Sequence, residues 1–233
     1  MSGHLNPGGQ QFRGDRGAAD PRVTAVLAAY QAGQASEQAA LAALAAARLL
    51  VPVVAVLADG TGAPGHGDKD SEMVLPTLIG RDGRAAVIAF TGLDALARWR
   101  PEARPMPAEA DRVWRAAVAD GCAVVIDVAG PVPLAVEGAR LAALAAGQPV
   151  PPPHEDPDVH AGVQAAVAAE SAIAGFSLAP GHAEGTDLAV TLHLSAPAQA
   201  SADWGPAVNR TAAGIAARLA ARLRRGIEVV IAE

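Results

Sequence analysis

Cysteine, lysine and aromatic residues are scarce in this chain of 233 residues, and each scarcity excludes something. Cys122 is the only cysteine, so the chain cannot form an internal disulfide, which is typical of a protein from the reducing cytoplasm. Aromatic residues make up 3% of the chain, whereas hydrophobic residues make up 51%. We therefore expect a core in which small aliphatic side chains let helices and sheets approach closely.

Basic excess and long apolar runs are absent as well. The formal net charge is -6, which argues against a protein that binds nucleic acid through a basic surface. Charges, glycine or proline interrupt every apolar run before it reaches about 18 residues, so we expect no membrane span. Residues 1–20 are polar and glycine-rich without an apolar stretch, which predicts no secretory signal and a flexible segment over 1–19.

Local signals predict the first elements of the chain. Asp20 and Pro21 are typical of a helix start, and Gly33 is typical of its end. A second, alanine-rich helix is expected over residues 36–48. The valine-rich run at 49–58 predicts a buried strand.

The middle of the chain is expected to form a hairpin followed by alternating helices and extended segments. Strands at 73–79 and 85–90 flank a tight Gly-Arg-Asp-Gly turn. Thr91 and Asp94 have the spacing of a capping box, which predicts a helix that ends near residue 99. The expected elements that follow are an extended crossing at 100–107, a helix at 108–119, a strand at 122–128 and a helix at about 137–146.

A proline-rich, acidic segment at 148–158 is expected to be a linker between two domains, one at 20–147 and one at 159–233. The overall class is α/β (α+β), with a mixed β-sheet and flanking helices in the N-terminal domain. The C-terminal domain has a small α-β-β-α-β order, with helices on one face of its sheet. Its expected elements are a helix at 159–170, strands at 172–178 and 187–194, a helix at 202–224 and a strand at 228–231.

Several segments together resemble a known family. They are "GDRGAADPRVTAVLAAY", "LLVPVVAVLA", "DKDSEMVLPTLIGRDGRAAVIAFTGLDALARWRPEARPMP" and "DVAGPVPL". In order and spacing they resemble the SseB family, the enhanced serine sensitivity proteins, in the form common in actinobacteria. The resemblance covers about residues 12–147, and "DLAVTLHLS" is similar to the SseB C-terminal domain. It implies an α/β N-terminal domain and a cytoplasmic protein, and it implies no particular reaction.

Gly60, Gly62 and Gly65 match the G-x-G-x-x-G pattern of a dinucleotide-binding loop. That loop needs a helix directly after it, because the helix N-terminus holds the pyrophosphate. Here a polar stretch and a strand follow, and Pro64 lies inside the pattern. We therefore expect a loop between strands and no nucleotide or other cofactor.

Lys69 is the only lysine beside 17 arginines. It can be a solvated loop residue, an anchor for an anion or a partner carboxylate, or a catalytic amine. A catalytic lysine needs a desolvated pocket, and this stretch is polar. The candidate binding group consists of Asp68, Lys69, Ser71 and Glu72.

A second candidate surface contains Trp99, Arg100 and Arg104. An aromatic residue with arginines on an extended segment is typical of a recognition surface, although Trp99 can equally anchor the end of its helix. The C-terminal arginines at 218, 222, 224 and 225 are expected to stabilise a helix dipole.

Two further groups favour structural roles. Residues 154–160 contain histidines and carboxylates that could bind a divalent metal, but we expect a solvated acidic linker. Cys122 lies in a valine-rich strand and is expected to be a core residue.

We therefore expect a cytoplasmic interaction or regulatory module without catalytic activity, which binds a protein or a small ligand. One alternative is a binder of, or an enzyme acting on, a small anionic metabolite held by Lys69. The other is a structural subunit of a larger complex. Neither nucleic acid nor a membrane is an expected partner.

Overall fold

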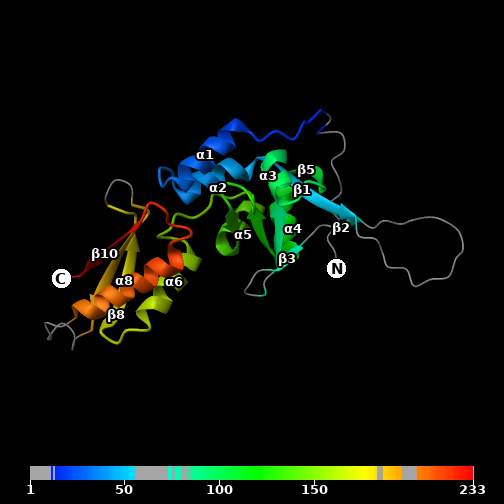
Figure 1. The fold of residues 1–233 in the computed structure, drawn as a ribbon. Coiled ribbons are helices and arrows are strands. Elements are labelled where there is room, and N and C mark those ends of the chain that lie inside the picture. The colour runs from blue at the N-terminus through cyan, green and yellow to red at the C-terminus, as the bar shows by residue number, and fades with distance from the viewer. Residues whose placement is uncertain are drawn as a thin grey trace, which may run out of the picture. The chain divides into compact units, whose positions relative to one another are not determined.

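The computed structural model describes residues 12, 14–55, 73–74, 77–79, 83, 85–182, 186–195 and 204–232 (Figure 1). By its contacts the chain divides into two compact units. The first contains residues 1–24, 45–137 and 144–147, and the second contains 25–44, 138–143 and 148–233. Residues 25–44 are thus grouped with the C-terminal part, and the expected domain limits at 147 and 159 stay a prediction.

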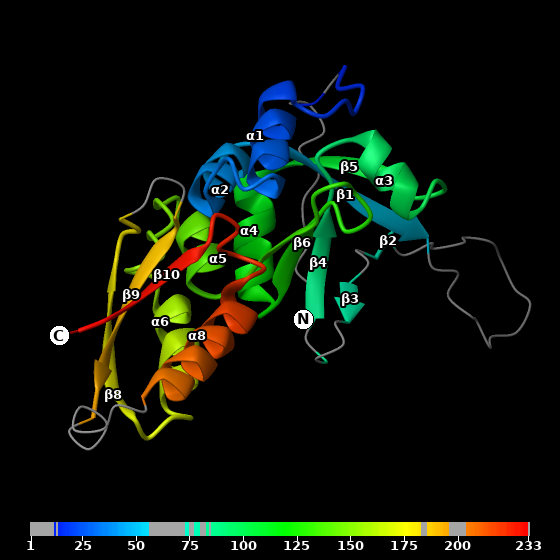
Figure 2. The ribbon, with the colours of Figure 1, turned by 60° about the vertical axis from the view of Figure 1, so that its left-hand side comes forward.

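Two small sheets form the first unit, which confirms the expected mixture of helices and strands. In one sheet the strand order is β2-β1-β5, and in the other it is β3-β4-β6-β7. Strands β4 and β6 run parallel and lie side by side, while the other pairs are antiparallel (Figure 2). The strand bounds are β1 Arg48–Ala55, β2 Met73–Val74, β3 Thr77–Ile79, β4 Ala85–Ala89, β5 Arg104–Glu109, β6 Ala123–Ile126 and β7 Leu134–Val136.

The two sheets meet at Leu50 and Phe90. The amide of Leu50 donates to the Phe90 carbonyl at 2.7 Å, and the amide of Phe90 donates back at 2.8 Å. Helices α3 (Leu93–Trp99) and α4 (Ala110–Ala119) complete the unit. Helix α4 buries Val113, Trp114 and Ala117 on one side, because residues three and four apart share a helix face.

Three sequence predictions for this unit were wrong. The expected strand at 73–79 is two strands in different sheets, β2 and β3, and the sequence places Pro76, which has no amide hydrogen, between them. The expected extended crossing at 100–107 contains most of β5, which pairs with β1 from Arg48 to Val53. Thr91 caps no helix, because Gly92 occupies the N-cap position of α3 without a side-chain hydrogen bond.

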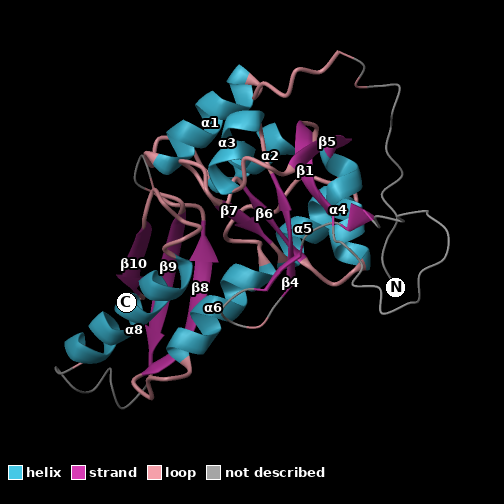
Figure 3. Cartoon of the chain, turned by 45° about the vertical axis from the view of Figure 1, so that its right-hand side comes forward, coloured by secondary structure: helices cyan, strands magenta, loops and turns pink. Residues whose placement is uncertain are grey.

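The second unit has the predicted α-β-β-α-β order in its C-terminal part. Its sheet has the order β10-β9-β8, with β9 parallel to β10 and antiparallel to β8 (Figure 3). Helix α1 ends at Gln31, and Gly33, two residues further on, has a φ of +70°. The element bounds are α1 Pro21–Gln31, α2 Glu37–Ala45, α5 Gly138–Ala145, α6 Pro157–Val167, β8 Ile173–Ala179, β9 Leu188–Leu194, α8 Gly205–Leu219 and β10 Ile227–Ile231.

Alternation along β9 builds the core of this unit. Leu188, Val190, Leu192 and Leu194 are buried and point to one face of the sheet, because successive side chains of a strand alternate. Helices α6 and α8 cover that face (Figure 2). They contribute the buried side chains Val159, Val163, Ala166, Val167, Ile215 and Leu219.

Candidate functional site

Three buried charged side chains and one half-buried arginine meet in the second unit. Glu37 lies in the first turn of α2, Arg140 lies in α5, Asp156 caps α6, and Arg222 follows α8. Arg140 Nη1 lies 2.5 Å from Glu37 Oε1, and Arg222 Nη2 lies 3.2 Å from Glu37 Oε2. Arg222 Nη2 also lies 2.5 Å from Asp156 Oδ2. We call these four residues the buried charge network.

The charges of the network balance, because two guanidinium groups face two carboxylates. No side chain in it is more than 14% exposed. Burial works against the charge of Arg222, but the carboxylates of Glu37 and Asp156 outweigh it and raise the pKa of the guanidinium. Such a group tolerates burial only while every partner is present.

The network corrects two sequence predictions. Residues 148–158 are not a solvated linker throughout, because the Asp156 side chain is 0% exposed and accepts the Asp158 amide at 2.8 Å. The long C-terminal helix does not extend to residue 224. It ends at Leu219, so Arg222 binds the network instead of stabilising the helix dipole.

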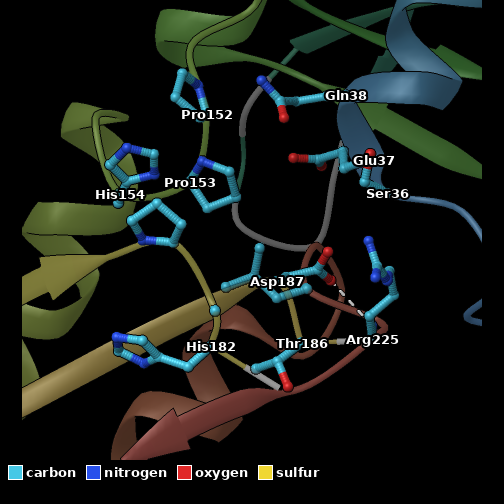
Figure 4. Close-up of a pocket in the computed structure, with 13 residues that line it drawn as sticks. Ser36, Glu37, Gln38, Pro152, Pro153, His154, His182, Thr186, Asp187 and Arg225 are labelled. Carbon is cyan, nitrogen blue, oxygen red and sulfur yellow. Dashed lines mark hydrogen bonds between the residues drawn. The ribbon is translucent and has the colours of Figure 1, made fainter. Parts of the chain in front are cut away.

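A pocket of about 500 Å³ adjoins the network, and Glu37 belongs to both (Figure 4). This volume lies within the range of about 300–1,000 Å³ that is usual for small-molecule sites. Its walls come from the start of α2, the segment before α6, the turn after β8 and the segment between α8 and β10. The lining residues are Ser36, Glu37, Gln38, Pro152, Pro153, His154, Pro180, Gly181, His182, Thr186, Asp187, Leu223 and Arg225.

Asp187 and Arg225 are neighbours in this pocket. The Arg225 amide donates to Asp187 Oδ2 at 3.0 Å, which is the dashed line in Figure 4. Burial raises the pKa of the Asp187 carboxyl, although that hydrogen bond and the charge of Arg225 both lower it. The acid is therefore engaged by the backbone of Arg225, and no ion pair joins it to the guanidinium within the described residues.

The Arg225 guanidinium is distinctive among the arginines of the second unit. Within the described ranges it has no hydrogen-bond or ion-pair partner. Each of the others has a hydrogen-bond, ion-pair or cation–π partner. These are Arg140 with Glu37, Arg210 with Glu170, Arg218 with the Gly214 carbonyl, Arg222 with Glu37 and Asp156, and Arg224 over the Tyr30 ring.

Two histidines line the same pocket, and each has a carboxylate neighbour. His154 Nε2 lies 3.6 Å from Glu155 Oε1, and His182 Nδ1 lies 3.4 Å from Glu228 Oε2. The hydroxyl of Ser36 accepts the Ala39 amide at 3.2 Å at the start of α2. The pocket thus combines one cationic side chain, Arg225, with two acids, Glu37 and Asp187, and two imidazoles.

The first unit contains a buried acid that the sequence did not reveal. Thr91 follows β4 and Asp127 follows β6, and because these strands are parallel, their carboxyl ends meet at one edge of the sheet. Asp127 Oδ1 accepts the Thr91 amide at 2.8 Å, and its Oδ2 accepts the Thr91 hydroxyl at 2.7 Å. Asp127 also has a φ of 49°, which is uncommon outside glycine. Thr91 therefore bonds to Asp127 instead of capping the predicted helix.

The sequence-predicted binding residues lie in different places. Asp68, Lys69, Ser71 and Glu72 lie outside the described residues, as does the glycine pattern at 60–65. Trp99 packs on Phe90 with ring centroids 5.6 Å apart, and Arg100 stacks over Trp99 at 4.9 Å. Arg104 is exposed on β5, opposite Val53 of β1. The structure brings Trp99 and Arg100 together, and their role in recognition stays a prediction.

Cys122 is not the core residue that the sequence suggested. It precedes β6, is half-buried, and its Sγ lies 3.5 Å from the Asp120 carbonyl. Among the described residues no three side chains of histidine, cysteine, aspartate or glutamate gather as a metal site. The same part of the chain contains no helix with the length and apolar character required to cross a bilayer.

Comparison with known proteins gives one match. A family model described as the SseB protein N-terminal domain matches residues 23–143, which is more than half of the chain. The matched segment includes α2 and Arg140, so two members of the buried charge network, Glu37 and Arg140, lie inside it. No curated protein and no solved structure matches.

Proposed function

The chain belongs to the SseB family, and from this premise we propose that it is a non-catalytic binding and regulatory module whose ligand occupies the pocket around Arg225. The observation that carries the proposal is a guanidinium that lines a cavity without a partner among the described residues. Arginine presents a rigid fork of donors that suits carboxylate and phosphate groups. A small ligand with an anionic group therefore fits this pocket best.

The surroundings of Arg225 support a pocket that is formed before the ligand arrives. The hydroxyl of Tyr30, itself 0% exposed, donates to the carbonyl oxygens of Ala221 and Arg222, both 3.1 Å away. Arg222 is in turn held by Glu37 and Asp156. These contacts hold the segment that precedes Arg225, and a preformed site loses less entropy when it binds its ligand.

The pocket chemistry favours binding over nucleophilic catalysis. An activated hydroxyl needs a base within hydrogen-bond reach. Among the described lining residues, neither Ser36 nor Thr186 has a hydrogen bond to a histidine or a carboxylate. His154 Nε2 lies near the Glu155 carboxylate instead, and His182 Nδ1 lies near the Glu228 carboxylate.

We place this module in the cytoplasm, because its only cysteine cannot form an internal disulfide.

One alternative is an anionic ligand held by Lys69, with Asp68, Ser71 and Glu72 beside it. It predicts that a Lys69 variant, and not an Arg225 variant, loses ligand binding. A role as a structural subunit predicts no ligand at Arg225 at all.

Calorimetric titration of the full-length chain with sulfate, at constant ionic strength, tests the proposal. We expect saturable binding that Arg225→Gln weakens by at least about tenfold, as the loss of a charge-assisted hydrogen bond requires. Arg218→Gln is the matched control, because Arg218 bonds to its own helix at Gly214. It should change the affinity by less than about twofold, as expected for an exposed charge.

Other outcomes have definite meanings. Equal losses in the Arg218 and Arg225 variants would mean that sulfate responds to general charge, and the pocket proposal would be rejected. Loss of binding in Lys69→Gln with full binding in Arg225→Gln would instead favour the Lys69 alternative.

A further inference from the structure

Asp187 is an unexpected neighbour for a site that binds anions. Its carboxyl and the Arg225 guanidinium line the same pocket, and the acid is bonded to the amide of that arginine at 3.0 Å. Resting on the proposed function, we infer that the ligand is a small oxyanion, a carboxylate or phosphate group, and that its binding at Arg225 is coupled to uptake of a proton by Asp187. The bound anion and the acid then share that proton.

The geometry favours such a proton. Because Asp187 and Arg225 line one pocket and their charges interact, an anion on the guanidinium shares that pocket with the Asp187 carboxyl. Two negative groups that share a site disfavour the charged form of one of them. A protonated carboxyl is also a hydrogen-bond donor, so the neutral acid adds a contact to the anion instead of repelling it.

The other charged groups around the pocket do not remove this repulsion. Glu37 is neutralised by Arg140 and Arg222, and Arg222 also pairs with Asp156. The remaining titratable groups are His154 with its neighbour Glu155, and His182 with its neighbour Glu228. Asp187 is therefore the acid whose charge most directly opposes an anion at Arg225.

Burial prepares Asp187 for this role. It raises the pKa of the carboxyl above its ordinary value, so less free energy is needed to protonate it when an anion arrives. The two histidines also become more positive as the pH falls, and this would tighten anion binding without Asp187. A test must therefore separate the acid from the histidines.

The test uses sulfate, which stays a dianion across the relevant pH range, and the full-length His154→Gln/His182→Gln variant. In this background we expect sulfate affinity to rise by at least about tenfold between about pH 8 and about pH 5, as linkage of one proton allows. Calorimetry in two buffers of different ionisation enthalpy should show net proton uptake. Adding Asp187→Asn should abolish both the pH dependence and the proton uptake, because asparagine can still accept the Arg225 amide.

The failures of the two proposals are distinguishable. A pH-independent sulfate affinity in the double-histidine variant would overturn the proton coupling, while the loss of binding in Arg225→Gln would still support the pocket. Full binding in Arg225→Gln would overturn both. Titration at about pH 6 with acetate and with methyl phosphate identifies the source of the oxyanion by the tighter ligand, and binding of neither would reject this ligand class.

Discussion

Arg222 Nη2 lies 2.5 Å from Asp156 Oδ2, although the two residues are 66 positions apart in the sequence. The contact joins the segment after α8 to the N-cap of α6. The same guanidinium reaches Glu37 at the start of α2, so one arginine holds three segments of the second unit. We infer that the pocket walls keep their positions because this arginine is present.

Replacing Arg222 by methionine should destabilise the protein by about 3 kcal/mol, because it leaves the buried carboxylates of Glu37 and Asp156 without their partner. Urea denaturation of the full-length chain measures the loss. Arg210→Met is the control, since Arg210 pairs with Glu170 but its side chain is 62% exposed. A loss in Arg222→Met no larger than in the control would show that the network contributes little.

Thr91→Val should destabilise the protein by about 1–3 kcal/mol, because it removes the hydroxyl that Asp127 Oδ2 accepts and leaves a buried oxygen unsatisfied. Thr91→Ser keeps a hydroxyl and should recover most of this loss. Thermal or urea unfolding compares the two variants. Equal stability of the serine and valine variants would contradict a role for the hydrogen bond.

The stability that depends on Asp127 should decrease as the pH rises. Burial raises the pKa of its carboxyl from the ordinary value of 3.8, against the hydrogen bonds from Thr91 and the charge of Arg98. The folded protein therefore binds this proton more tightly than the unfolded chain does. The resulting stability is complete at pH values below the unfolded pKa and is lost as the pH rises through the folded pKa.

Asp127→Asn removes this titration, so the difference in unfolding free energy between wild type and variant should be larger at about pH 4 than at about pH 7. Urea denaturation at both pH values measures it. A difference that grows toward neutral pH would mean that the fold favours the ionised carboxylate.

Gly33 and Gly147 offer a matched pair of helix ends. They follow α1 and α5 with φ values of +70° and +67°, so alanine at either position should cost about 1 kcal/mol of stability. Only Gly33 adds a close contact, since a Cβ there would lie 3.3 Å from the Arg224 carbonyl oxygen. Gly33→Ala should therefore be the more destabilising variant in urea unfolding. The reverse order would contradict close packing of α1 on the segment that precedes Arg225.

The order of helices and strands could be predicted because local signals determine it. Asp20, Pro21 and Gly33 mark the two ends of α1, and alternation over residues 188–194 predicts β9. The resemblance to the SseB family was also correct, since the family model matches residues 23–143. These features depend on residues that are close in the sequence.

The candidate site could not be predicted for the opposite reason. Glu37, Arg140, Asp156 and Arg222 are spread over most of the chain, and charge alone does not tell which carboxylate meets which arginine. Asp156 was assigned to a solvated linker because its neighbours are acidic and proline-rich. Thr91 was assigned to a helix cap because its tertiary partner, Asp127, lies 36 positions away. Long-range partners override local preferences in both cases.

The most direct test of anion binding at Arg225 is a nuclear magnetic resonance titration of the full-length protein with sulfate, following backbone amides. The Arg225 amide donates to Asp187, so it should report any ligand on either residue. We predict saturable shifts at Arg225 and at the lining residues Gln38 and Thr186, which disappear in Arg225→Gln and persist in Arg218→Gln. Shifts that increase linearly, or that spread over the exposed arginines without a maximum at Arg225, would contradict a binding site in this pocket.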